Sequence, residues 1–488
     1  MKKLPYPRVL KAAAIFSALF TGHLYLQALT PFFLLESDPY LHIKLASLAA
    51  ENGVMQSFPW TQFSIWRDAF CDKDFLFHFL LIPFTIGDLM SGAKLATAFF
   101  SALAGTCLYA ALLACRIRWA VLYVIALYAS GIPFAVRLVT LRTYLWSLTC
   151  LIACVVLILR RRYFLLCVTS SVFFLSYSAF PILFAVAGAA ALSESLISKR
   201  LNLKAPVAVL VGFAAAFILH PQRENCIQTL YVQNITVLKA AVSGVHIIPT
   251  VTELLSIAPT EFLQSFWFVI LLQIVSVIAW LRRRESRTEE SCFLGITCGG
   301  FLTASLVWHR FLEYWVPFGL WWSASVIKYA ALPHSKLKLL AGFLIPLGAA
   351  SLGIHLKQLH GYLLHLPPQP ALAAGSWMST HLAEGELVFE CDPKETSRLL
   401  FKNQKNHYLF LSDPNFFYQF DAELFAVWKK VVRGESKDPA REICSSFGAH
   451  LVYINHRCNR LADKLRSSAK TIYKTPYDGV VELNCPDR

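Results

Sequence analysis

Acidic side chains occur twice in the first long polar stretch of the chain. Asp38 lies in the segment from Glu36 to His42, where a long apolar run ends, and Asp72 and Asp74 alternate further along. A carboxylate at the mouth of a membrane span is costly to bury, so Asp38 is a candidate catalytic base or metal ligand. Carboxylates at alternate positions bind hard divalent cations through oxygen. Asp72 and Asp74 are therefore candidate metal ligands, although a solvated turn before a helix would give the same pattern.

Two later segments carry further charged candidates. Glu253 could hold a metal ion or an acceptor, although the spacing from Thr250 to Glu253 also matches the capping box of a helix start. Arg310 stands at the edge of an apolar run, where its guanidinium could bind phosphate in a bidentate fork. Snorkelling of Arg310, or a helix pair with Glu313, would explain the same residue, and these interpretations stay open.

The composition decides the class of protein. Hydrophobic residues make up 56% of the 488 residues, and the mean hydropathy is +0.51, whereas ordinary globular chains are roughly 45–50% apolar. The formal net charge of +15 arises from short basic clusters between apolar runs and not from one continuous basic face. The chain is therefore an integral, multi-pass membrane protein, and nucleic acid is not an expected partner.

Apolar runs long enough to cross a membrane recur through the first 355 residues. Because about 20 residues span the hydrocarbon layer, the sequence predicts about eleven transmembrane helices. They are centred near residues 24, 104, 127, 151, 169, 188, 212, 271, 299, 322 and 346. The first run, from about residue 12 to 35, is too long for a signal peptide and lacks a clear cleavage site, so we expect a retained first span.

Basic clusters follow every second predicted crossing. They lie at residues 116–118, 160–162, 199–204, 282–287 and 328–338, and the N-terminus is also basic. The positive-inside rule therefore predicts a cytoplasmic N-terminus. Residues 36 to about 90, 130–142, 176–181, 220–261, 308–314 and everything after about 355 would then face the opposite side, the periplasm if the membrane is a bacterial inner membrane.

The composition changes in the C-terminal part, so we expect two domains, 1–355 in the membrane and 356–488 outside the cytoplasm. Strands are predicted at 387–390, 407–411, 450–455 and 480–483, and helices at 421–433, 438–446 and 457–468. This alternation predicts a small α/β domain of about 110 residues. The tail holds four cysteines, Cys391, Cys444, Cys458 and Cys485, whose spacing permits but does not require a disulfide.

The order of the charged motifs resembles the catalytic subunit of oligosaccharyltransferase, a membrane enzyme of the GT-C fold. That family carries an acidic residue for catalysis and metal binding in its first external loop, which Asp38 matches. Its TIxE or SVSE motif is similar to Thr250-Val251-Thr252-Glu253, and its arginine that contacts the lipid-linked diphosphate is matched by Arg310. The soluble C-terminal domain is similar in placement.

The chain departs from the family pattern at two motifs. The second external loop has Arg137-Leu138-Val139-Thr140-Leu141-Arg142, without a carboxylate, where the family has a second acidic motif. The WWDYG signature is absent, and Trp377 and Asp392 are only loosely placed counterparts. These departures point to a divergent relative that uses a simpler polyprenyl-phosphate sugar or a non-protein acceptor.

The resemblance implies a GT-C glycosyltransferase in protein or cell-envelope glycosylation. It would move a sugar or oligosaccharide from a polyprenyl phosphate or diphosphate carrier to a protein, glycan or lipid acceptor on the non-cytoplasmic face, with Mg or Mn as the metal. The expected residues are Asp38 and Glu253 in catalysis, Arg310, Arg137 and Arg142 on the lipid phosphate, and Asp38, Asp72, Asp74 and Glu253 on the metal.

Two other functions fit a polytopic chain. A transporter or lipid flippase would also place charged groups in membrane segments, but the sequence shows neither repeat symmetry nor paired broken spans. An inactive scaffold would explain the missing second acidic motif.

Overall fold

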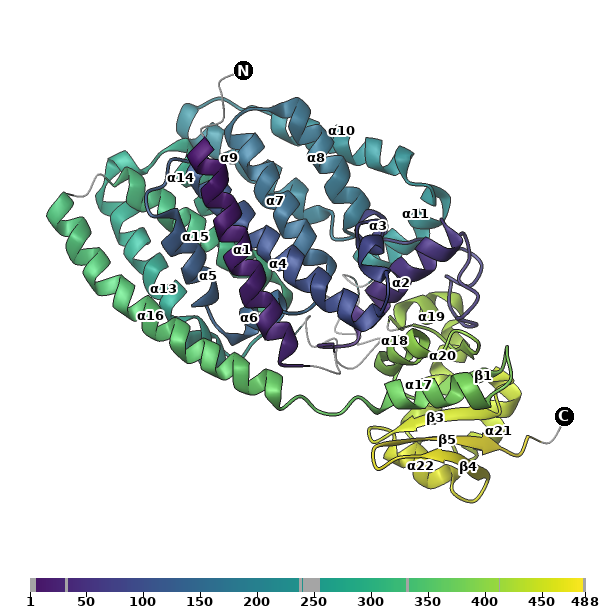
Figure 1. The fold of residues 1–488 in the computed structure, drawn as a ribbon. Helices are drawn as coiled ribbons and strands as arrows, with labels where there is room; N and C mark the ends of the chain where they lie inside the picture. Colours follow the sequence, from purple (N-terminus) through teal and green to yellow (C-terminus); the bar gives the residue numbers. More distant parts are fainter. Residues whose placement is uncertain are drawn as a thin grey trace. The chain divides into compact units, whose positions relative to one another are not determined.

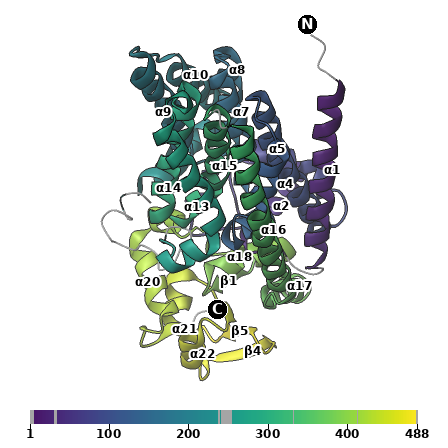
Figure 2. The same ribbon diagram turned by 90° about the vertical axis from the view of Figure 1, so that its left-hand side faces the viewer.

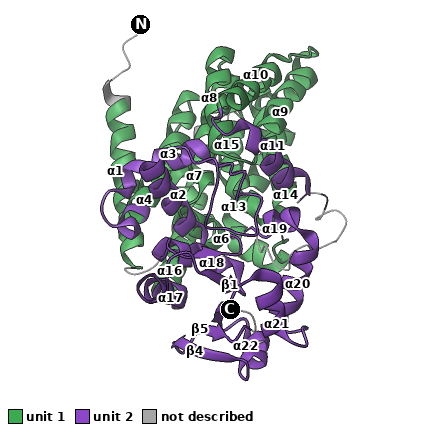
Figure 3. Ribbon diagram, turned by 90° about the vertical axis from the view of Figure 1, so that its right-hand side faces the viewer, with its two compact units in different colours: residues 1–32, 94–219, 249–366 green, residues 33–93, 220–248, 367–488 purple. Residues whose placement is uncertain are grey.

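The computed structural model describes residues 6–30, 34–236, 239, 255–330, 333–411 and 413–485. The chain forms two compact units, which Figure 3 distinguishes by colour. Unit 1 comprises residues 1–32, 94–219 and 249–366, and unit 2 comprises 33–93, 220–248 and 367–488. Each unit is built from segments that are far apart in the sequence, and each is described by itself.

Unit 1 is helical in its described residues (Figure 1). Its long helices are α1 (Tyr6–Ala28), α4 (Leu89–Ala114), α7 (Thr143–Leu159), α8 (Tyr163–Ser176), α9 (Pro181–Ser198), α10 (Lys204–Leu219), α13 (Pro259–Arg282), α14 (Glu289–Val307), α15 (Leu312–Tyr329) and α16 (His334–Leu364). Its shorter elements are α5 (Ala120–Tyr128), α6 (Ile132–Leu138) and the 3₁₀ turns η4 (Arg284–Ser286) and η5 (His309–Phe311).

Six described helices are long and apolar enough to cross a membrane, namely Val9–Ala28 within α1, α4, α9, α13, α14 and Ser335–Leu364 within α16. The count rises to seven if α5 and α6 form one broken span. The spans predicted near residues 151, 169 and 212 correspond to the shorter apolar helices α7, α8 and α10, of 17, 14 and 16 residues. Several described helices could thus span a membrane, as the sequence predicts, whereas the number of eleven spans stays a prediction.

The span predicted near residue 127 is bent by 100° between α5 and α6. Gly131 lies at the bend with a φ of 142°, and a Cβ there would collide with the Ser265 carbonyl. Only glycine fits this backbone conformation without strain. Pro133 then follows in the first turn of α6, where its missing N–H costs no helical hydrogen bond.

Helix α15 forms the core of unit 1. It contacts α13, α14, α5, α6 and α7, and Figure 2 shows it near α5, α7, α13 and α14. Its side chains Tyr314, Trp315 and Trp321 are fully buried. In contrast, only 6% of the apolar window of α1 and 11% of that of α16 are buried inside the protein, as expected for helices that face lipid.

Unit 2 combines helices from the middle of the chain with the whole C-terminal part. Its N-terminal and central elements are α2 (Asp38–Asn52), α3 (Phe75–Leu81), the 3₁₀ turn η1 (Ile82–Thr85), α11 (Arg223–Tyr231) and the π-helical turn η2 (Val232–Thr236). Its C-terminal helices are α17 (Pro370–His381), α18 (Pro393–Lys402), α19 (Asn415–Phe420), α20 (Ala422–Val432), α21 (Pro439–Glu442), the π-helical turn η6 (Ile443–Phe447) and α22 (Asn459–Leu465).

A five-stranded mixed sheet organises the C-terminal part. Its strands are β1 (Leu387–Glu390), β2 (His407–Tyr408), β3 (Leu451–Asn455), β4 (Ala469–Lys474) and β5 (Asp478–Leu483), in the order β2-β1-β3-β5-β4. β1 pairs in parallel with β2 and β3, whereas β5 pairs antiparallel with β3 and β4. One core packs α2, α17 and α18 with Val388 and Tyr453, and another packs α20 and α22 with Phe389 and Val452. Because alternate strand residues face opposite sides, the sheet has a core on each face.

The sequence predictions for the tail agree with most of these elements. All four predicted strands exist, and the three predicted helices correspond to α20, to α21 with η6, and to α22. Strand β4 and helices α17, α18 and α19 were not predicted. The expected domain border after residue 355 falls inside α16, while the compact units divide after residue 366. The two sequence domains stay a prediction.

Candidate active site

Asp38 is the first residue of α2, and its side chain is half-buried. The Ser37 hydroxyl donates to Asp38 Oδ1 at 3.4 Å. A carboxylate in the first turn of a helix is stabilised by the partial positive charge of the unsatisfied N–H groups there. Asp38 therefore lies where a helix end favours a carboxylate side chain, the group that a metal ligand or base requires.

The first turn of α2 is fixed by hydrogen bonds within unit 2. The buried Tyr40 hydroxyl accepts from the Leu34 amide at 2.9 Å and donates to Gln369 Oε1 at 2.5 Å. Burial raises the pKa of Tyr40 to about 12, so the hydroxyl keeps its proton at neutral pH. One turn further, Lys44 Nζ donates to Gln404 Oε1 at 2.6 Å. These bonds hold α2, and with it Asp38, against segments from the C-terminal part of the chain.

Asp72 and Asp74 are both buried, which excludes a solvated turn. The Asp74 amide donates to Asp72 Oδ1 at 3.1 Å, and His78 Nδ1 lies 2.7 Å from both Asp72 carboxylate oxygens. Asp74 also occupies the position before α3, as expected if this segment leads into a helix. The Asp72 carboxylate therefore already has partners inside the protein. The oxygen ligands of Asp38, Asp72 and Asp74 suit Mg or Mn chemically, but their joint use as metal ligands stays a prediction.

Two histidines that were not predicted as site residues extend this acidic group. His78 Nε2 lies 2.8 Å from His42 Nδ1, and both rings are buried. Burial by itself would lower the pKa of His78, but the nearby Asp72 and Asp74 charges outweigh it, so the pKa is raised. His42 follows Asp38 by four residues and therefore lies on the same side of α2. This i, i+4 spacing was the signal that could have identified His42.

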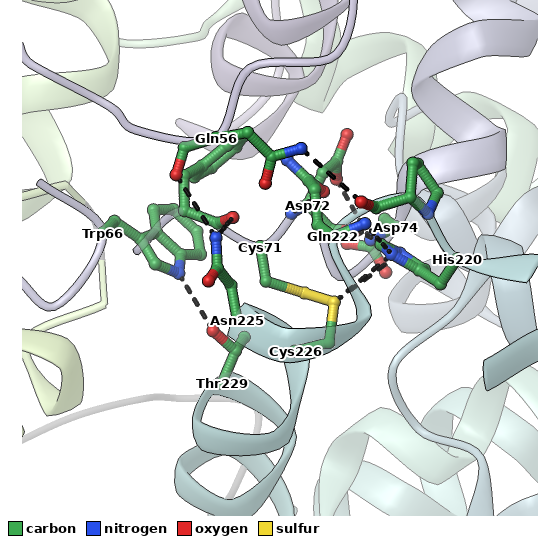
Figure 4. Close-up of a disulfide and its surroundings, with 12 residues drawn as sticks. Gln56, Trp66, Cys71, Asp72, Asp74, His220, Gln222, Asn225, Cys226 and Thr229 are labelled. Carbon is green, nitrogen blue, oxygen red and sulfur yellow. Dashed lines mark hydrogen bonds between the residues drawn. A yellow bond between two sulfur atoms is a disulfide. The ribbon is translucent and has the colours of Figure 1, made fainter. Parts of the chain in front are cut away.

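A disulfide between Cys71 and Cys226 joins the acidic loop to α11 (Figure 4). Beside it, the Asp72 amide donates to Gln222 Oε1 at 2.8 Å, and His220 Nε2 lies 3.2 Å from the Asp72 carbonyl oxygen. Gln222 and His220, 150 and 148 positions away in the sequence, thus contact the amide and the carbonyl oxygen of Asp72.

The side chains of Cys71, Cys226 and His220 also lie close enough together to hold a metal ion. Sγ of Cys71, Sγ of Cys226 and a ring nitrogen of His220 lie within 4.8 Å of one another, the one such cluster among the described residues. A metal would need thiolates, whereas here the sulfurs are bonded to each other. This sulfur and nitrogen set does not fit Mg or Mn, which prefer oxygen.

In unit 1, Arg310 lies in η5 and is half-buried. Arg310 Nη2 donates to the Tyr177 hydroxyl at 3.3 Å, and Tyr177 accepts from the Tyr314 hydroxyl at 2.9 Å. The alternative interpretation was an ion pair between Arg310 and Glu313 on one helix. The structure shows a different ion-pair partner for Glu313. Glu313 Oε2 instead accepts from Arg137 Nη1 at 2.8 Å.

The Arg137–Glu313 ion pair is almost completely buried, with 8% and 1% of the two residues exposed. Its second carboxylate oxygen, Glu313 Oε1, has no hydrogen-bond partner among the described residues. Arg137 thus compensates a buried charge within unit 1. Arg142 is half-buried at the start of α7, and Glu253 lies outside the described residues. The roles predicted for these three residues remain untested.

No family model and no curated protein matches the sequence. Comparison with solved structures, in contrast, finds the oligosaccharyltransferase of Archaeoglobus fulgidus. Its apo form matches with a TM-score of 0.64 at 12% identity, over 98% of this chain and 75% of that chain. The form tethered to an acceptor peptide with the NVT sequon matches with a TM-score of 0.65, also at 12% identity and over 98% and 75% of the two chains. The complex with Zn and sulfate matches with a TM-score of 0.63 at 13% identity, over 95% and 72%.

The likeness extends over nearly the whole chain although few residues are identical. The resemblance inferred from the order of three short motifs is thus confirmed at the level of the fold. The chain shares the fold of the archaeal oligosaccharyltransferase structures, with membrane-spanning helices and a small sheet domain at its C-terminal end.

Proposed function

We propose that the protein is a GT-C glycosyltransferase that moves a sugar or oligosaccharide from a polyprenyl phosphate or diphosphate to an acceptor on the non-cytoplasmic side of the membrane. The observation that carries the proposal is the fold likeness to oligosaccharyltransferase over 98% of the chain. The motif order Asp38, Glu253, Arg310 adds to it, because the same three motifs occur in that family in the same order.

Arg310 is the proposed phosphate-binding residue. Its hydrogen bond goes to a neutral hydroxyl, that of Tyr177, and the nearby Glu313 carboxylate is ion-paired with Arg137. A guanidinium has five N–H donors, so the bond to Tyr177 orients Arg310 and leaves donors for phosphate oxygens. Tyr314, which donates to Tyr177, supports this orientation from α15. Arg310 would stabilise the negative charge that grows on the leaving phosphate.

Asp38 is the proposed acceptor-side residue. In the proposed step, the acceptor nucleophile forms a bond to the anomeric carbon while the bond from that carbon to the phosphate oxygen breaks. The electron pair stays on the polyprenyl phosphate or diphosphate, and the acceptor proton passes to Asp38 or to water. Glu253 would assist on the acceptor side. A Mg or Mn ion held by carboxylates of this chain would supply Lewis-acid stabilisation of charge.

A transporter is the second candidate, and one observation favours it. The bent α5–α6 pair has the form of a broken span, an element from which transporters build binding sites. Transporters typically have such breaks in corresponding positions of two halves, whereas the described residues contain one bent pair. The glycosyltransferase proposal therefore accounts for more of the chain.

Donor consumption in vesicles tests the proposal. The purified full chain, reconstituted in vesicles, is given a panel of radiolabelled sugars on polyprenyl phosphate or diphosphate, together with peptide, glycan and lipid acceptors. We expect a covalent product from one donor and acceptor pair, lost with EDTA and restored by Mg or Mn. Movement of intact donor between leaflets without any product would overturn the proposal in favour of transport. Product formation that is unaffected by EDTA would refute the proposed role of a metal ion in the reaction.

A further inference from the structure

A cavity of about 220 Å³ lies in unit 1, apart from the residues proposed for glycosyl transfer. A single buried water needs only roughly 10–15 Å³ on this measure, so the cavity has room for a chemical group of several non-hydrogen atoms. Its wall includes Arg160 and Arg161 after α7, Glu194 on α9, and Glu289 at the start of α14. It is thus a cavity lined by charges of both signs.

The cavity lies where several helices of unit 1 end or begin. α4 ends at Ala114, α7 at Leu159 and α9 at Ser198, while α8, α10 and α14 begin at Tyr163, Lys204 and Glu289. All six elements contribute to the wall. The basic cluster 160–162 belongs to this end, which is the end predicted to meet the anionic cytoplasmic surface. The cavity is therefore expected at the depth of the lipid headgroups.

The charges around the cavity are paired only weakly. Arg161 Nη2 lies 3.3 Å from both Glu194 Oε1 and Glu289 Oε1, and the Arg161 side chain is 57% exposed. Ion pairs of this length to an exposed guanidinium contribute little stability, so a ligand can replace them at little cost. Arg160 is held in place because its Nη2 donates to the Ala114 carbonyl at 2.6 Å, which leaves further guanidinium donors.

Neutral polar groups complete the wall. Asn202 Nδ2 donates to the Tyr163 hydroxyl at 3.3 Å, and both residues line the cavity. Glu290, another lining residue, accepts from Lys328 Nζ at 3.4 Å, so its charge is compensated from α15. The charged groups available to a ligand are thus the Arg160 guanidinium and the weakly paired Arg161, Glu194 and Glu289.

We propose that this cavity binds the headgroup of a membrane phospholipid that carries both a phosphate and a primary ammonium, as in phosphatidylethanolamine. The phosphate would accept from Arg160 and Arg161, and the ammonium would donate to Glu194 and Glu289. Two oppositely charged pairs match a zwitterion better than an anion or a cation alone. The site is separate from the residues proposed for glycosyl transfer, so the inference does not depend on that function.

Headgroup chemistry makes the proposal specific. A primary ammonium donates three hydrogen bonds to carboxylates, whereas a trimethylated choline donates none and a glycerol headgroup lacks the positive charge. We therefore expect phosphatidylethanolamine to be bound in preference to phosphatidylcholine and phosphatidylglycerol, by about tenfold for the loss of one charge-assisted bonding partner.

Native mass spectrometry of the full chain tests the site. The protein is released from bilayers that contain equal amounts of the three lipids, and the retained lipids are counted. We expect wild type to retain one phosphatidylethanolamine, and Arg161→Gln and Glu194→Gln each to lower its retention about tenfold. Arg162→Gln is the matched control, because Arg162 belongs to the same basic cluster but does not line the cavity, and it should retain lipid as wild type does.

Three results would overturn the proposal. One is equal retention of the three lipids by wild type. This comparison uses no variant, so it remains valid even if a variant does not fold. Another is unchanged retention in both Arg161→Gln and Glu194→Gln. The last concerns the source of the ligand: if soluble phosphoethanolamine binds lipid-free protein as well as the lipid does, the site recognises a soluble metabolite and not a membrane lipid.

Discussion

The two compact units differ in the oxidation state of their cysteines and in where their apolar side chains lie. All seven free cysteines lie in unit 1, while all six remaining cysteines form three disulfides in unit 2. Unit 1 exposes many large apolar side chains, for example Phe164, Leu219 and Leu339. Unit 2 instead has two apolar cores around its sheet. This contrast is typical of one part in contact with lipid and another in an oxidising aqueous compartment.

The comparison also shows how each unit uses buried polar groups. In unit 1 the buried Arg137 and Glu313 neutralise each other across 176 residues of sequence. In unit 2 a disulfide and histidine contacts hold Asp72 in place. The buried charges of unit 1 are thus compensated by internal ion pairing, whereas the acidic loop of unit 2 is anchored covalently. Variants of the Arg137–Glu313 ion pair and of a disulfide in unit 2 separate ion pairing from covalent cross-linking as sources of stability.

The largest effect is expected when the buried ion pair of unit 1 is broken. Arg137→Met leaves the Glu313 charge buried without its ion-pair partner, which should lower the free energy of unfolding by about 3–5 kcal/mol. Adding Glu313→Leu should restore most of the loss, because an apolar pair carries no charge. Denaturant unfolding in detergent measures both variants.

The control for this prediction is an exposed ion pair in unit 2. Arg466 and Asp463 lie 2.9 Å apart with 81% and 63% of their side chains exposed, so Arg466→Ala should cost less than about 1 kcal/mol. If Arg137→Met is no more harmful than Arg466→Ala, the ion pair does not stabilise unit 1 as described.

Removal of a disulfide from unit 2 should lower the free energy of unfolding somewhat less than breaking the buried ion pair of unit 1. The double variant Cys391→Ala and Cys458→Ala opens a bond between residues 67 positions apart, and such bonds typically contribute about 2–5 kcal/mol. Cys292→Ala in unit 1 is the matched control, since this cysteine is free and partly exposed, and should cost less than about 1 kcal/mol. Disulfide mapping under non-reducing conditions accompanies the unfolding measurement, and finding Cys391 and Cys458 as free thiols in wild type would contradict the contrast between the units.

A smaller, pH-dependent effect is expected at Glu390 in β1. Burial raises the pKa of Glu390 to about 8, although its oxygens accept from the amides of Leu409 and Phe410. The folded state therefore binds a proton more tightly than the unfolded state does. The resulting stability is complete below about pH 4.5 and is lost as the pH rises to about 8, on the order of 1 kcal/mol per pH unit.

The variant Glu390→Gln checks this prediction because it cannot titrate and still offers one oxygen acceptor. Its unfolding free energy should change less between pH 5 and pH 8 than that of wild type. Equal pH dependence in the two proteins would show that Glu390 is ionised in the folded state.

Local patterns in the sequence allowed much of the fold to be predicted. The apolar runs predict helices because membrane spans need about 20 such residues, and the four predicted strands have the apolar side chains of a buried sheet. Strand β4 was not predicted because its residues are exposed or half-buried, so its sequence lacks an apolar pattern. The helix from Pro393 also went unnoticed, although Asp392 caps it by accepting from the Lys394 amide at 3.1 Å.

The candidate site was predicted less completely because its contacts are distant in sequence. The spacing of Asp72 and Asp74 identified the acidic loop, but neither the Cys71–Cys226 disulfide nor the contact between His42 and His78 follows from a local pattern. Likewise, Glu313 lies three residues after Arg310, which suggested a helix pair. Its actual partner is Arg137, a residue that only the tertiary structure brings close.

The most direct test of the account compares glycosyl transfer by wild type, Asp38→Asn and Asp68→Asn in vesicles with a lipid-linked donor. Asp68 is the matched control because it lies in the same loop but is 71% exposed and paired with Arg67. We expect Asp38→Asn, and in parallel Arg310→Gln, to lower the rate about 100-fold or more, while Asp68→Asn stays near wild type. If Asp38→Asn transfers sugar as fast as Asp68→Asn, the proposed active site is wrong.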